Sequence, residues 1–212
     1  MTESGYITMN KKQKYLKKRK KEYNKLNIKP VEIKYSKEDL WYKFEHRYEL
    51  RKLPFQWIPK FHLNARKAMG DYDWTKLSKE IRQKANYTCE YCGEYHPESH
   101  GTECHEEWDY LLKEGKGIYV LRNLKCVCKK CHSVCHPGAT QFFGRDVEEA
   151  LNRYCAINKV DKKTMIKELY ESKAIRDYLA SSVQEWELEE NIFDKIEVKY
   201  GIKCRPKNII EF

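Results

Sequence analysis

Two Cys-x-x-Cys pairs constrain this chain more than any other feature of its sequence. Cys89 and Cys92 form the first pair, and Cys128 and Cys131 form the second. Each pair can turn on a short loop, so that four thiolates surround one Zn²⁺ at ~2.3 Å in a tetrahedron. The first ten residues contain no apolar core of a signal peptide, so the thiols are interpreted as metal ligands and not as a disulfide framework. The sequence therefore predicts a structural zinc site.

The remaining cysteines are expected to have other roles. Cys126 competes with Cys128, but only Cys128 has the Cys-x-x-Cys spacing to Cys131. Cys155 and Cys204 lie on or near expected regular elements and are expected to behave as small buried hydrophobes.

Positive charge is concentrated at the N-terminus. The chain has 42 Lys and Arg against 32 Asp and Glu, and residues 1–30 carry +8 of the net +10. Such a run repels itself and suits a polyanionic partner, because each phosphate contact releases counterions. We expect a flexible basic arm over 1–30 that binds nucleic acid through a dense cluster: Lys17, Lys18, Arg19, Lys20 and Lys21. A solubilising tail is the other interpretation of this arm.

The rest of the chain is expected to form an aromatic-rich extension with a helix over 31–86, a cysteine-rich unit over 87–144 and a helical extension ending in a strand over 145–212. Helices are predicted from Ser36, from Trp74 to Lys84 with Asp73 as N-cap, from Asp146 to Ile157, and after Asp161. Strands are predicted at Ile118–Leu121 and at the alternating Ile196, Val198 and Tyr200. No run is apolar enough for a membrane span, and we expect a cytoplasmic protein.

Polar residues between and after the cysteine pairs suggest a second site. His105 follows Cys104 in a Glu-Cys-His-Glu stretch, and Asn123 precedes the second pair. His132 and His136 are four residues apart, which on a helix places both imidazoles on one face, where they can share a metal ion. Each residue has a plain structural explanation, so the prediction rests on their occurring together.

These residues resemble the HNH endonuclease family, whose fold is a ββα-metal finger. The likeness covers residues 87–144. Within the family, the chain resembles small bacterial and phage members with a Glu-Cys-His-Glu motif. The resemblance implies an α+β fold whose centre is a zinc-stapled ββα-metal finger. The basic arm and the aromatic-rich wrapping segment precede this finger, and the helical extension follows it. The resemblance also implies a metal-dependent enzyme that hydrolyses DNA phosphodiester bonds.

The resemblance assigns roles to single residues. His105 would be the general base and Asn123 would hold the loop that orients it, while His132 and His136 would bind the catalytic ion. Cys104 stands where many members have Asp or His as a metal ligand. A thiolate suits Zn²⁺ better than Mg²⁺, so Cys104 either joins the two histidines around the catalytic ion or only packs. Of these two roles, ligation is the expected one. Mg²⁺, Mn²⁺, Ni²⁺ and Zn²⁺ all stay candidates for the catalytic ion.

Two other functions fit parts of the sequence. The basic arm and the four cysteines would suffice for a catalytically inactive, zinc-stapled nucleic-acid-binding module. A protein-interaction scaffold would use the aromatic segment and the C-terminal helices but leave the histidines unexplained. DNA is the expected partner, and a homodimer or a larger phage or bacterial assembly would let two fingers cut opposite strands.

Overall fold

The computed structural model describes residues 41–42, 52–56, 58–59, 63–97, 101–113 and 115–207 of the 212-residue chain. The predicted basic arm over 1–30, with its lysines and Arg19, lies outside the described residues, as does most of the segment from 31 to 62. The described part is a mixed α+β structure.

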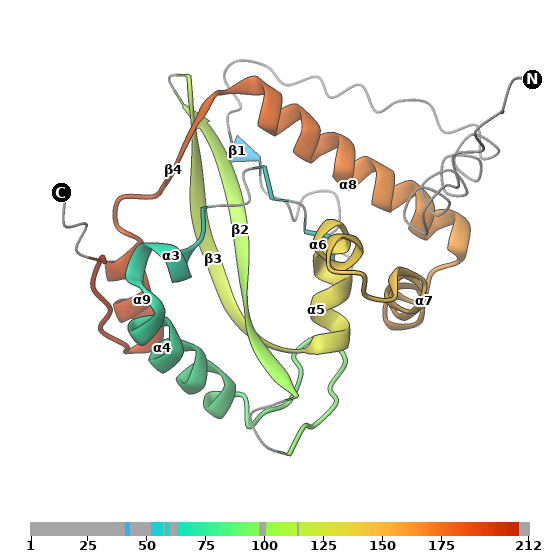
Figure 1. Ribbon diagram of the computed structural model, residues 1–212, viewed down its shortest axis with the longest axis horizontal. Coiled ribbons are helices and arrows are strands. Elements are labelled where there is room, and N and C mark those ends of the chain that lie inside the picture. Colours follow the sequence, from blue (N-terminus) through green and yellow to red (C-terminus); the bar gives the residue numbers. More distant parts are fainter. Residues whose placement is uncertain are drawn as a thin grey trace, which may run out of the picture.

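A long antiparallel hairpin forms the centre of the fold (Figure 1). Its strands are β2 (Thr102–Lys113) and β3 (Lys116–Cys128), and the second strand includes the predicted Ile118–Leu121. Two short strands complete the sheet in the order β1-β2-β3-β4: β1 (Trp41–Tyr42) pairs antiparallel with β2, and β4 (Glu185–Leu188) pairs parallel with β3. Gly117 is required at this last pairing, because a Cβ atom there would clash with the indole of Trp186.

Helices flank the hairpin on two sides (Figure 1). On one side lie α3 (Ala65–Met69), α4 (Asp71–Lys84) and α9 (Ile192–Tyr200). On the other side lie α5 (Lys129–Cys135), α6 (Pro137–Phe142) and α7 (Val147–Asn158). Apolar side chains of α3, α4 and α9 belong to one hydrophobic cluster, and those of α5 and α7 belong to another.

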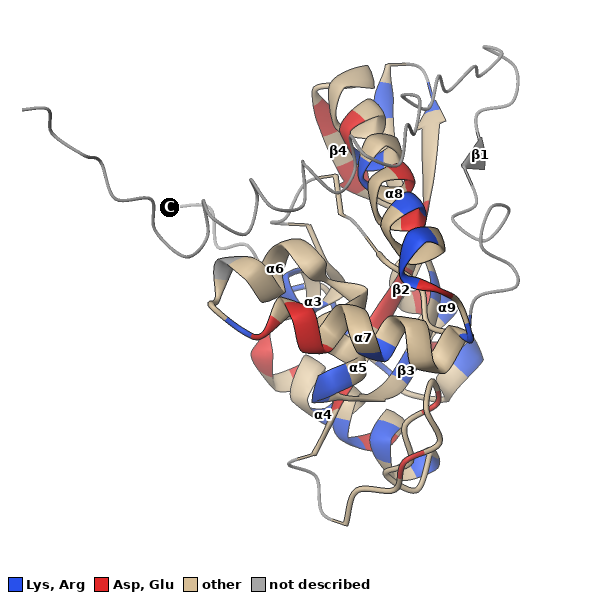
Figure 2. Cartoon of the chain, turned by 90° about the vertical axis from the view of Figure 1, so that its right-hand side faces the viewer, with Lys and Arg blue, Asp and Glu red and all other residues tan. Residues whose placement is uncertain are grey.

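The helix α8 (Lys162–Ser182) contributes to both clusters. Its Met165 and Ile166 belong to the cluster that includes residues of α5 and α7, whereas Ile175 and Leu179 belong to the cluster that includes residues of the hairpin, α4 and α9. Figure 2 shows Lys and Arg alternating with Asp and Glu along the same helix, where Lys173 and Asp177 form an ion pair at 2.5 Å. One face of α8 therefore contributes to both halves of the core. Most of its charged residues lie toward solvent, but Glu168 is buried.

Capping residues explain where two helices begin. The carboxylate of Asp146 accepts a hydrogen bond from the backbone N–H of Glu149 at 2.9 Å, and that of Asp161 accepts one from Thr164 at 2.7 Å. Both predicted starts are confirmed. By contrast, α4 begins at Asp71 and not at Trp74, because α3 runs into it through Gly70 at a φ of 86° and the acidic residues then occupy its first turn.

Two other predictions of secondary structure were wrong. The predicted C-terminal strand is the helix α9, in which Ile192 and Ile196 are four residues apart and buried, while Val198 is exposed. Helical spacing of the buried residues therefore outweighed the alternation of side chains. In the helix predicted from Ser36, only Trp41–Tyr42 are described, and they form a strand against Tyr110 and Leu111. Among the described residues, no helix combines the length and apolar character that crossing a bilayer demands.

Candidate metal centres

The four predicted cysteines come together between the hairpin and α5. Cys89 and Cys92 lie on the loop after α4, where Gly93 turns the chain at a φ of 78°. Cys128 ends β3, and its sulfur accepts a hydrogen bond from the backbone N–H of Cys131 at 3.5 Å. The four sulfurs lie within 4.8 Å of one another.

One distance between the sulfurs can be compared with what a zinc ion needs. The Sγ atoms of Cys92 and Cys128 are 3.9 Å apart. Four Zn–S bonds of ~2.3 Å in a tetrahedron place sulfurs roughly 3.8 Å from one another. This arrangement is consistent with a zinc site. Cys126 lies outside this cluster, and its backbone N–H donates to Glu90 Oε2 at 2.6 Å, which ties the first cysteine loop to β3.

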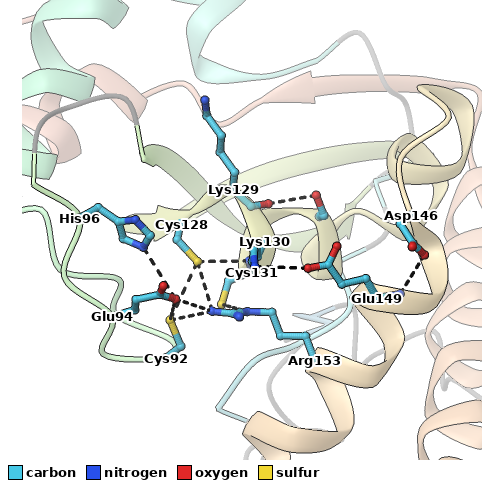
Figure 3. A network of polar contacts seen from close by, with 11 residues as sticks. Cys92, Glu94, His96, Cys128, Lys129, Lys130, Cys131, Asp146, Glu149 and Arg153 are labelled. Atoms are coloured by element: carbon cyan, nitrogen blue, oxygen red, sulfur yellow. Dashed lines mark hydrogen bonds and ion pairs between the residues drawn. The ribbon is translucent and has the colours of Figure 1, made fainter.

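Arg153 of α7 contacts the same four-cysteine centre (Figure 3). Its guanidinium donates hydrogen bonds to the sulfurs of Cys92, Cys128 and Cys131. Sequence reasoning missed this residue, because an arginine 22 positions after the last of the four cysteines carries no spacing signal.

A second cluster consists of three histidines. His105 comes from β2, His132 from α5, and His136 from the residue that ends α5. The three ring centroids are 4.9 to 5.0 Å apart, and one nitrogen of each ring lies within 4.8 Å of the others. The predicted pair His132 and His136 does lie together, although His136 is the capping residue after α5 and not part of the helix. The third member is His105, the residue expected to act as a general base.

Hydrogen bonds engage one nitrogen of each ring. Nδ1 of His132 contacts a carboxylate oxygen of Glu103, and Nδ1 of His136 lies 3.3 Å from the backbone oxygen of Gln56. Nε2 of His105 lies 3.0 Å from Oε1 of Gln56, while its Nδ1 is buried with no hydrogen-bond partner among the described residues. The other nitrogen of each ring is thus left to bind an ion, as is usual when a histidine ligand is oriented through its second nitrogen.

Burial keeps two of these rings in the form that binds metals. Desolvation, followed by the nearby His136 and His132, lowers the pKa of His105 well below its ordinary value. Desolvation also lowers the pKa of His136 to about 3, with His132 adding to the effect. Both rings are therefore neutral at neutral pH, and neutral imidazole is the metal ligand. The hydrogen bond from His132 lowers the pKa of the Glu103 carboxyl, which stays ionised.

Gln56 is the second residue that sequence reasoning missed. It is 3% exposed and touches two of the three histidines. Its side-chain amide also donates to the backbone oxygen of Glu106 at 2.9 Å, and its backbone N–H donates to the oxygen of Cys135 at 2.7 Å. The segment before α3 thereby fastens β2 to α5 at the histidine cluster.

Cys104 does not join the histidines in the structure. Its side chain is 7% exposed and packs in the cluster that contains Trp108 and Leu124. Neighbouring residues of a strand point to opposite faces, so only one of Cys104 and His105 can face α5. Desolvation raises the pKa of the Cys104 thiol, which keeps it protonated and a poor ligand. The expected ligation by Cys104 is thus replaced by packing.

Asn123 does not belong to the histidine cluster, which consists of His105, His132 and His136. It faces Glu107 across the hairpin, and its Nδ2 donates to Glu107 Oε2 at 3.0 Å. Tyr91 donates to the other oxygen of Glu107 at 2.8 Å, and the Tyr91 ring lies 6.2 Å from that of His105. Glu107 and Tyr91 therefore lie between Asn123 and His105 in a chain of contacts.

The carboxylate of Glu107 is the centre of this buried network. Lys125 lies 3.0 Å and Arg122 3.2 Å from its oxygens, and the side chain of Glu107 is 3% exposed. Burial opposes its charge, but Lys125 and Arg122 together with Tyr91 lower the pKa of Glu107 below its ordinary value. The network sits where the register of β2 and β3 shifts between Glu107 and Trp108.

A cleft of about 570 Å³ opens beside the histidine cluster. All three histidines line it, and the helices α3, α4 and α6 supply other parts of its wall. Its lining includes the cations Arg66, Lys67, Arg82 and Arg145 and the carboxylates Glu103 and Glu106. A neighbouring cleft of about 660 Å³ shares Arg66 and Lys67 with it and adds Asp71 and Lys207. Such a surface favours an anionic ligand next to the histidines.

No protein-family model, curated protein or solved structure matches this chain.

Proposed function

We propose that this protein is a metal-dependent endonuclease of the HNH type that hydrolyses phosphodiester bonds of DNA. One observation carries the proposal: three buried or half-buried histidines converge at a cleft that is lined with cations. A divalent ion held by imidazoles lowers the pKa of a bound water and offsets charge on phosphate oxygens.

The order of elements supports the HNH type. The strands β2 and β3 and the helix α5 follow one another without interruption, which is the order ββα. Cys89 and Cys92 precede the hairpin, and Cys128 and Cys131 stand at its junction with α5. His105 lies on the first strand and His132 on the helix of this ββα order.

Within this proposal we assign His105 as the third ligand of the ion. Gln56 engages its Nε2, and its buried Nδ1 would otherwise stay without a hydrogen-bond partner among the described residues, at a cost in stability. Three imidazole ligands leave a coordination position for water or a phosphate oxygen. Glu103 would hold His132 in the matching tautomer.

The cations of the cleft would bind the DNA backbone. Lys67 lies on α3, and Arg145 follows α6. Glu106, in the same lining, has its pKa raised to about 7 by desolvation, so it repels a phosphate less than an ordinary carboxylate does. Backbone contacts of this kind position a duplex without reading its sequence.

Plasmid nicking tests the proposal. The full-length protein is assayed with Mg²⁺, Mn²⁺, Ni²⁺ and Zn²⁺ beside His105→Ala and His136→Ala, and the metal content of each protein is measured. We expect both variants to lose at least about 100-fold in rate. A ligand role for His105 predicts that the variant also loses the second metal ion, whereas a general-base role predicts that it keeps it.

The inactive binding module is the alternative outcome. The cations of the cleft and the four cysteines would suffice for it, without any reaction at the histidines. DNA binding without cleavage under every metal would favour that function and reject the nuclease.

A further inference from the structure

We propose that Arg153 retains zinc in the four-cysteine centre by donating hydrogen bonds to three of its four sulfurs. The inference depends on zinc binding by the cysteines and not on nuclease activity. It assigns a metal-retaining role to α7, which lies beyond the predicted finger.

The contacts of Arg153 are short and converge on one point (Figure 3). Its Nη2 lies 3.1 Å from the sulfur of Cys92 and 3.5 Å from that of Cys128, and its Nε lies 3.2 Å from that of Cys131. Glu94 Oε2 accepts from the same Nη2 at 3.0 Å. The carboxylate therefore holds the guanidinium against the sulfurs.

Charge gives these contacts their effect. Four thiolates around one Zn²⁺ leave a net charge of about −2, which is costly where the surroundings are largely buried. Cys128 and Cys131 are 1% and 0% exposed. A guanidinium stays positive and presents several N–H groups in one plane, so it can offset this charge and hydrogen-bond more than one sulfur. Outer groups that hydrogen-bond metal ligands typically change metal affinity by about 10–100-fold.

A second pair of residues joins the same two helices without touching the sulfurs. Lys130 of α5 and Glu149 of α7 form an exposed ion pair at 3.4 Å. Removing that exposed pair should change one contact between α7 and α5 while leaving Arg153 in place. Glu149→Gln is therefore the matched control for Arg153→Gln.

The experiment measures zinc transfer from the full-length protein to a chromophoric chelator. We expect Arg153→Gln to weaken zinc affinity by about 10–100-fold and to release zinc faster, whereas Glu149→Gln behaves as the unchanged protein. Arg153→Lys keeps the charge but loses the planar set of donors, so it should lie between the two. Release from Arg153→Gln at the unchanged rate, or equally fast release from Glu149→Gln, would overturn the inference.

A spectroscopic measurement separates hydrogen bonding from folding. With Co²⁺ in place of zinc, sulfur-to-metal absorption bands report the electron density on the thiolates. Loss of N–H···S bonds raises the energy of the sulfur lone pairs, so the bands of Arg153→Gln and of Arg153→Lys should shift to longer wavelength. Unshifted bands in both variants would overturn the role, because a purely structural effect of Arg153 leaves the sulfurs unchanged. Failure of the unchanged protein to bind zinc or Co²⁺ would refute it together with the zinc centre, whatever the nicking assay gives.

Discussion

The side chains of Cys104 and His105 point to opposite faces of β2, although the two residues are neighbours in the chain. His105 faces α5 and meets His132 and His136, while Cys104 packs in the apolar cluster on the other side. The strand can present only one of them to the second metal centre. The candidate ligands of the proposed second centre are therefore three imidazoles and no thiolate.

Removing the thiol of Cys104 should leave the histidine centre intact. We expect Cys104→Ala to bind a second metal ion with unchanged stoichiometry and to lose only a little stability, because one small buried group is removed. Metal analysis after loading and dialysis checks the stoichiometry, with His136→Ala as the variant that should lose the ion. Loss of the second ion from Cys104→Ala would restore Cys104 to the ligand set.

Gln56 should control the affinity of the histidine centre. In Gln56→Ala, His105 loses the acceptor of its Nε2 hydrogen, and we expect the second metal ion to bind about 10–100-fold more weakly. Gln56→Glu keeps an acceptor at that place and should bind more tightly than the alanine variant. Competition titration measures both affinities. Equal affinities for Gln56→Ala and the unchanged protein would show that the tautomer of His105 is set in another way.

Lys67 and Arg145 should contribute to DNA affinity through phosphates. Each replacement by Gln is expected to reduce the slope of log K against log salt by about 0.9 for duplex DNA. Fluorescence anisotropy over a range of salt concentrations measures the slope, with the exposed Lys163 of α8, which lines neither cleft, as the control position. An unchanged slope in both cleft variants would place the DNA elsewhere.

Zinc removal should unfold one half of the molecule before the other. Cys89, Cys128 and Cys131 belong to the hydrophobic cluster that includes Leu151 and Tyr154 of α7, whereas α4 and α9 pack in the other cluster. Structural zinc supplies folding free energy directly, so chelation should expose the amides of α5 and α7 first. Hydrogen exchange followed by mass spectrometry measures this. Simultaneous loss of protection in α4 and α9 would indicate a single cooperative unit.

The predictions that succeeded rest on spacing along the chain. The four cysteines could be grouped because Cys-x-x-Cys closes on a local loop. The closeness of His132 and His136 could be predicted because four residues make about one helical turn, whereas metal binding by this pair stays a prediction. The capping roles of Asp146 and Asp161 are equally local.

What sequence reasoning missed depends on the register of elements far apart in the chain. Whether Cys104 or His105 faces α5 is set by how β2 pairs with β3. Gln56 and Arg153 reach their centres from outside the predicted finger over 87–144, and neither residue type signals metal binding by itself. The domain boundaries stay a prediction, but both predicted flanks contribute to the two centres.

Gln56 also bears on how such a chain could be reused or reshaped. Because it supports two imidazoles from outside the ββα unit, the excised unit would carry the ligands but not the clamp that orients them. A chimera that joins residues 87–144 to another DNA-binding domain would therefore have less firmly oriented histidines. A transferred segment that keeps these contacts must also include the preceding part of the chain, at least from residue 52 onward.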